Sequence, residues 1–148
     1  MISIRLFSAL DFSEVSRITV DCFEKINFIN MNPDELKYAK EYYSTTKLLE
    51  STKSFDFYIC KFNNQIVGSV AFNKNQLHNL FVDPNFHKMG IGKKLLEFAE
   101  SIIFENYSDV VLDSSPYAVG FYKKFGYEIL DNSKNKLGLA ISMKKEKP

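Results

Sequence analysis

The first part of the chain changes from a strand-like to a helix-like spacing of apolar residues. Apolar and polar residues alternate over residues 2–7, which predicts a strand. Residues 11–26 begin with Asp11, a candidate N-cap, and carry apolar residues at helical spacing. Residues 33–50 begin with proline and acidic residues, which are typical of a first helical turn. One strand followed by two helices is therefore predicted.

Short apolar runs of strand character follow. Residues 56–62 and 65–72 flank a polar turn at Asn63 and Asn64, and this spacing predicts a hairpin. Further strands are predicted over residues 76–83, 109–113, 127–130 and 137–143.

Two more helices separate these strands. An apolar stripe that starts at Ile91 and ends near residue 105 predicts one of them. A shorter helix over residues 116–125 has Ser115 as a candidate N-cap and Gly126 as the residue that closes it. The order of strands and helices predicts an α+β fold with a mixed sheet, in one domain over residues 1–148.

Composition narrows the function classes. The 19 Lys and Arg residues nearly balance the 18 Asp and Glu residues, which argues against nucleic acid or an anionic membrane as the main partner. No apolar stretch approaches the length of a membrane span, and the N-terminus does not resemble a secretion signal, so a cytoplasmic location is predicted. Cys22 and Cys60 lie far apart without a CxxC motif, which predicts reduced, core-facing thiols and no metal site.

The segment FHKMGIGKKL, residues 86–95, carries the clearest chemical signal. A glycine-rich turn between a strand and a helix exposes unpaired backbone N–H groups at the positive end of the helix dipole, and such a turn binds anions. The segment lacks the spacing and the Lys-Ser/Thr pair of a Walker loop, and Leu95 stands where a dinucleotide fingerprint needs its third glycine. Both common nucleotide motifs are therefore excluded.

Two segments together point to a family. LFVDPNFHKMGIGKKLLEFA resembles the acetyl-CoA-binding segment of the GCN5-related N-acetyltransferases, the GNAT family, and SSPYAVGFYKKFGYE resembles a later motif of the same family. The resemblance implies a central splayed mixed sheet flanked by about four helices, and acetyl-CoA or coenzyme A as the cosubstrate without a metal. The cofactor would contact the chain at Leu80, Phe81, Val82, His87, Lys88, Met89, Gly90, Ile91, Gly92, Lys93, Ser115 and Tyr122.

The resemblance also suggests catalytic residues. Acetyl transfer to an amine needs a base, a donor to the developing oxyanion and an acid for the leaving thiolate. Tyr122 matches the family tyrosine that serves as the acid, and a backbone N–H near Phe81 or Val82 would meet the oxyanion. His78 is the preferred base, because its ordinary pKa suits the task, and Glu24, Glu35 and Glu41 are alternatives.

Two residues depart from the family pattern. His87 stands where Gln or Arg is usual. The contact of this side chain with the phosphate is therefore expected to be weaker or pH-dependent. Asp113 stands where many relatives have Asn, and its carboxylate is expected either to contact the pantetheine or to repel an anionic substrate.

The acceptor would lie on the two N-terminal helices. Six residues are candidates for lining its pocket or for packing the helices on the sheet: Phe23, Phe28, Met31, Tyr38, Tyr42 and Tyr43. The acceptor remains open between a small-molecule amine, an amino-acid derivative, a peptide N-terminus and a lysine side chain. A non-catalytic acyl-CoA-binding module is the alternative function, and a homodimer is an open expectation.

Overall fold

The fold is built on a seven-stranded mixed sheet with the order β1-β2-β3-β4-β5-β7-β6. It comes from a computed structural model of the chain, which describes residues 1–27, 32–42, 44–134 and 140–148. The strands are β1 (Ile2–Leu6), β2 (Asp56–Phe62), β3 (Gln65–Asn73), β4 (Gln76–Val82), β5 (Asp109–Ser114), β6 (Glu128–Lys134) and β7 (Ile141–Glu146).

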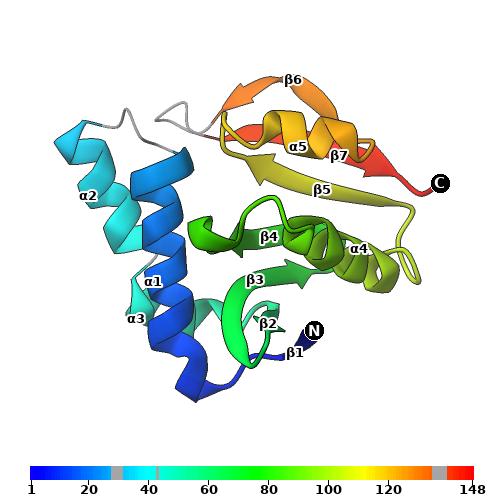
Figure 1. Cartoon of the computed structure of the whole chain (residues 1–148). Helices are drawn as coiled ribbons and strands as arrows, with labels where there is room; N and C mark the ends of the chain where they lie inside the picture. The colour runs from blue at the N-terminus through cyan, green and yellow to red at the C-terminus, as the bar shows by residue number, and fades with distance from the viewer. Residues whose placement is uncertain (28–31, 43, 135–139) are drawn as a thin grey trace.

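Helices cover both faces of this sheet (Figure 1). They are α1 (Phe12–Cys22), α2 (Pro33–Tyr42), α3 (Thr45–Ser51), α4 (Ile91–Ile103) and α5 (Val119–Lys124). Short turns of other helical types add Ala9–Asp11, Phe23–Asn27 and Pro84–Phe86. The buried apolar residues of α4 and Tyr122 of α5 pack in one core cluster, and Val15 of α1 and Leu48 of α3 pack in a second. Adjacent residues of β3 separate the clusters, since Val70 belongs to the first and Ala71 to the second.

The sheet is splayed at its centre, as the family resemblance implies. β4 and β5 run parallel but share one registered pair, Gln76 with Val111, which a hydrogen bond from the Val111 N–H to the Asn75 carbonyl extends (2.9 Å). Both strands continue past this point without a further registered pair. Backbone groups that face the gap are therefore left without the partners that a regular sheet supplies.

The hairpin between β2 and β3 is confirmed. Asn63 and Asn64 both adopt positive φ values, 49° and 68°, as a tight two-residue hairpin turn requires. The two cysteines are confirmed as buried free thiols.

Three local expectations are wrong in detail. The helix expected over residues 33–50 is divided, since α2 ends at Tyr42 and Ser44 begins α3 by accepting a hydrogen bond from the Lys47 N–H. The helix expected to follow Ser115 directly begins at Val119, because residues 116–118 form a turn in which the Ala118 N–H bonds to Ser115. Asp11 occupies the N-cap position of α1, but its carboxylate binds Arg5 and the Ser8 N–H instead of the helix.

Candidate active site

A bulge in β4 lies beside the gap between β4 and β5. Between the pairs Ala71–His78 and Ser69–Phe81 the register shifts by one residue, and Asn79 takes a positive φ of 52°. The extra residue interrupts the ladder and redirects the backbone at the place where the strands part. The side-chain oxygen of Asn79 is buried and has no hydrogen-bond partner among the described residues. A buried acceptor without a donor is costly, and a ligand N–H would satisfy it.

The glycine-rich turn leads into the N-terminus of α4. Lys88 and Gly90 both lie in the left-handed region, with φ values of 65° and 78°, and Gly90 is the N-cap residue of a 13-residue helix. A Cβ at Gly90 would meet nothing within 4 Å, so the space beside this backbone is open. Lys88, Met89 and Gly90 are exposed, and the first N–H groups of α4 have no intrahelical partners. This geometry suits an anion.

The two glycines of the turn have different roles. A Cβ at Gly92 would lie 3.3 Å from the ring of Phe121, so this glycine allows α4 to approach α5 closely. Gly90 instead provides a backbone conformation that L residues rarely adopt. Of the neighbouring predicted cofactor residues, Ile91 is buried in the core and Lys93 is exposed.

Side chains from α1 and from the turn hold the end of β4. Arg17 binds the carboxylate of the buried Asp83 at 2.9 Å, and Asp83 in turn accepts a hydrogen bond from the Asn85 N–H. The carbonyl of Val82 accepts the Cys22 thiol at 3.1 Å and lies 2.8 Å from Nε2 of His87. Burial raises the pKa of Cys22 to about 12, so the thiol stays protonated and donates. These contacts fix the strand from which the turn begins.

His87 therefore contacts β4 through one of its ring nitrogens. Whether its other nitrogen reaches a phosphate stays a prediction. Leu80, Phe81 and Val82, the residues predicted to lie along the cofactor, are half-buried beyond the registered pair of β4 and β5. Phe81 packs on Phe23, which directly follows α1, with ring centroids 5.6 Å apart.

Tyr122 lies on α5 with only 6% of its surface exposed. Its ring packs against Phe121 and Tyr127, at centroid distances of 5.2 and 5.6 Å. Burial raises the pKa of the hydroxyl well above its ordinary value, so the group is protonated at neutral pH. The hydroxyl makes no hydrogen bond to any residue that the structure describes, whereas a buried tyrosine usually finds a partner.

His78 lies on β4 directly before the bulge and on the face opposite the α4 layer. Its ring stacks on Phe55, with centroids 4.7 Å apart and planes inclined by 10°. Burial lowers the pKa of the imidazole, and the charge of Asp113 on β5 offsets part of that effect. His78 is therefore neutral at pH 7 and able to accept a proton.

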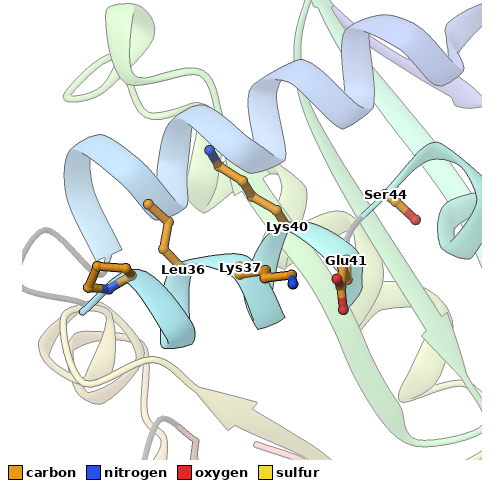
Figure 2. Close-up of a pocket in the computed structure, with 6 residues that line it drawn as sticks. Leu36, Lys37, Lys40, Glu41 and Ser44 are labelled. Carbon is orange, nitrogen blue, oxygen red and sulfur yellow. The ribbon is translucent and has the colours of Figure 1, made fainter.

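The glutamates considered as alternative bases have other contacts or lie away from the gap. Glu24 forms an ion pair with Lys40 at 2.8 Å, and Glu35 accepts a hydrogen bond from the Asn32 N–H. Glu41 lines a groove of about 470 Å³ along α2, together with Pro33, Leu36, Lys37, Lys40 and Ser44 (Figure 2).

The residues expected around the acceptor are only partly described. Phe23 is buried and packs on the sheet, and Tyr38 is exposed. Phe28, Met31 and Tyr43 lie outside the described residues, as does the side chain of Tyr42. Ser115 is half-buried, and its hydroxyl accepts a bond from the Ala118 N–H. A direct contact between Ser115 and the cofactor stays a prediction.

Sequence reasoning missed Asn79 and the pair of Arg17 with Asp83. An asparagine tolerates positive φ better than most residues, which is a weak signal for a bulge within an apolar strand. The ion pair joins residues 66 positions apart, and no local pattern indicates it.

The described part of the chain has neither a metal-binding cluster nor a membrane-spanning helix. No group of three or more His, Cys, Asp or Glu residues there is arranged to hold a metal ion. Within the same residues, none of the helices combines the length and apolar character needed to cross a membrane.

Solved structures resemble this fold over nearly its whole length. A PaiA N-acetyltransferase from Thermoplasma acidophilum, solved in complex with coenzyme A, superposes with a TM-score of 0.83 at 23% identity and covers 99% of each chain. A GCN5-related N-acetyltransferase from Rhodopseudomonas palustris gives a TM-score of 0.87 at 19% identity, over 98% of this chain and 95% of that one. At these identities the likeness concerns the fold.

Sequence comparisons identify the family. The peptidyl-lysine N-acetyltransferase YjaB of Escherichia coli K12 is 34% identical over 70 residues, which are 47% of this chain and 47% of YjaB. The chain thus matches about half the length of such curated relatives. A profile described as the acetyltransferase (GNAT) domain matches residues 28–147, most of the chain. The chain therefore belongs to the GNAT acetyltransferase family.

Proposed function

We propose that the protein transfers an acetyl group from acetyl-CoA directly to a primary amine of a small molecule or a peptide. The observation that carries the proposal is Tyr122, a nearly buried residue whose protonated hydroxyl has no hydrogen-bond partner among the described residues. It lies on the motif helix that packs against the N-terminus of α4. A binding module without turnover has no need of such an acid.

The residues beside the gap fit coenzyme A. The turn at Lys88 to Gly90 and the first N–H groups of α4 suit a diphosphate, and the open space at Gly90 leaves room for one. The unpaired backbone of β4 and the orphaned Asn79 oxygen suit the amide groups of the pantetheine. Acetyl-CoA supplies the activated acyl group when bound.

Side chains of the protein then accept and donate the protons of the reaction. His78 takes one proton from the acceptor ammonium and releases it to water, because an amine with a pKa of about 10 is mostly charged at pH 7. The amine nitrogen forms a C–N bond to the acyl carbon as the C–S bond breaks. Tyr122 gives its proton to the departing sulfur, and the second proton lost by the nitrogen restores the Tyr122 hydroxyl through water.

The choice of acceptors to be tested is guided by the family and by the relatives of this chain. The name of YjaB specifies peptidyl lysine, which supports the inclusion of lysine side chains among the acceptors to be tested. A small-molecule amine is the other class. The groove along α2 is one place that would bind the part of an acceptor away from its reacting amine.

The first test is a calorimetric titration with acetyl-CoA, with ATP as the control ligand. Saturable binding of acetyl-CoA without a response to ATP is expected. An acceptor screen that monitors thiol release then separates an enzyme from a binding module. Absence of acetyl-CoA binding would overturn the proposal, and binding without thiol release from any lysine peptide or small amine would favour the non-catalytic module.

A further inference from the structure

Asp113 of β5 carries a carboxylate across the gap from His78 of β4. Gln76 and Val111 are in register across the parallel strands β4 and β5, and two residues farther along each strand come His78 and Asp113. Side chains two residues apart lie on the same face of a sheet, and neighbouring parallel strands are roughly 5 Å apart where they pair. His78 and Asp113 thus lie on the same face of the sheet, on the two strands that border the gap. The negative charge of Asp113 acts on the imidazole.

Both side chains lie on the face opposite α4 and α5. Leu77 and Leu112, the residues that precede them, are buried in the core cluster of α4 and α5. Phe55, on which His78 stacks, packs in the second cluster with α1 and α3. The carboxylate therefore lies across the sheet from the helix that carries Tyr122, on the side where an acceptor would approach.

Asp113 is held in place but not neutralised. Its Oδ1 accepts a hydrogen bond from the Ser142 hydroxyl, its partner on β7, at 2.8 Å. The residue is exposed, and no Lys, Arg or His among the described residues forms a salt bridge with it. Lys144, two residues from Ser142 on the same face of β7, binds Glu146 at 2.9 Å. One carboxylate oxygen is thus available to a ligand cation.

We propose that Asp113 binds the ammonium group of the acceptor and presents it to His78, which makes the acceptor a cationic amine without a carboxylate close to the reacting nitrogen. This inference rests on the proposed acetyl transfer and specifies its acceptor. A carboxylate stabilises an ammonium by a charge-assisted hydrogen bond, and it repels a second carboxylate. Of the two roles expected for Asp113, this placement favours the choice of substrate over a contact with the pantetheine.

The test measures amine binding without turnover. The chain has two histidines, so ring signals of His78 in an NMR spectrum are assigned with one variant, His87→Gln. Cadaverine, 1-aminopentane and glutarate are titrated into the protein with and without coenzyme A. The two amines are expected to shift the His78 signals, and Asp113→Asn is expected to weaken their binding about tenfold, the loss of one charge-assisted hydrogen bond. Glutarate is expected to leave the signals unchanged.

A matched variant controls for net charge. Glu97→Gln removes one negative charge from an exposed position of α4 and is expected to leave amine affinity unchanged. Equal amine affinity in Asp113→Asn and the unmodified protein would overturn the inference, as would equal shifts from glutarate and cadaverine.

Thiol release from acetyl-CoA with the same amines is measured separately. Amine binding that depends on Asp113 without any thiol release would keep this inference and reject the acetyl transfer. Thiol release that Asp113→Asn leaves unchanged would reject this inference alone.

Discussion

The two faces of the sheet present their chemistry in different ways. On the face of α4 and α5, the proposed cofactor contacts are mostly backbone groups, set by a left-handed glycine and a helix N-terminus. On the face of α1 to α3, the proposed acceptor contacts are the side chains of His78 and Asp113. Backbone sites need particular glycines and therefore leave a sequence motif, whereas side-chain sites depend on which strands meet.

This difference separates binding from selectivity. The proposed cofactor face can be shared by many relatives, because its backbone N–H groups would bind the same cofactor in each of them. If Asp113 binds the acceptor as proposed, one substitution at position 113 would change the substrate without disturbing the turn at Gly90. Variants on the two faces should consequently affect different kinetic constants.

The largest effect is expected for Tyr122→Phe. The change keeps the ring in its contacts with Phe121 and Tyr127 but removes the proton donor. Loss of a general acid typically lowers kcat by about 10²- to 10⁴-fold, while the Kd for acetyl-CoA should change little. Steady-state thiol release and calorimetry measure the two quantities. An unchanged kcat in this variant would mean that Tyr122 is not the acid of the reaction and serves only in packing.

The next effect concerns the structure that supports the cofactor face. A Cβ at Gly68 of β3 would lie 2.8 Å from the Phe81 carbonyl oxygen and 3.0 Å from a Leu95 methyl group, so Gly68→Ala forces β4 or α4 to shift. The free energy of unfolding is expected to fall by about 1–3 kcal/mol. Urea unfolding followed by circular dichroism measures it. Gly120→Ala is the control, because a Cβ there meets nothing within 4 Å.

Sequence alone predicted well the elements that form the proposed cofactor face. The strand, the turn at Gly90 and the amphipathic helix α4 are local features, and local periodicity and glycine spacing indicate them. The hairpin at Asn63 and Asn64 was predictable for the same reason. The break between α2 and α3 was missed, although the Ser-Thr-Thr run at 44–46 was an available N-cap signal.

The remaining features depend on long-range register. Whether His78 and Asp113 lie on the same face of the sheet is decided by the pairing of Gln76 with Val111, which no local pattern specifies. The Arg17–Asp83 ion pair and the bulge at Asn79 likewise arise only when α1, β3 and β4 have assembled. The sequence indicated His78 and Asp113 as separate candidates, but it could not show that they lie on the same face of the sheet.

A smaller effect tests the role of the left-handed glycine. Gly90→Ala adds a methyl group to open space but places it at a φ of 78°, which costs roughly 1 kcal/mol. The helix N-terminus should relax from its geometry, so the Kd for acetyl-CoA should rise about fivefold with kcat nearly unchanged. Gly120→Ala also adds a methyl group to open space, but within an ordinary helical turn. It should not destabilise the protein, and equal Kd values for the two variants would mean that the turn does not hold the cofactor.

The smallest effect is the contribution of His78, on the proposed acceptor face, to the pH dependence of the free energy of unfolding. Burial lowers its folded-state pKa below 6.5, so the folded protein binds fewer protons than the unfolded chain as the pH falls through that value. The free energy of unfolding should therefore decline below about pH 6.5 and be flat above it with respect to this group. In His78→Gln, urea unfolding at pH 5.5 and pH 7.5 should show a smaller difference than in the unmodified protein. An equal difference in both proteins would mean that His78 titrates alike when folded and unfolded, and it would contradict the lowering of its pKa by burial.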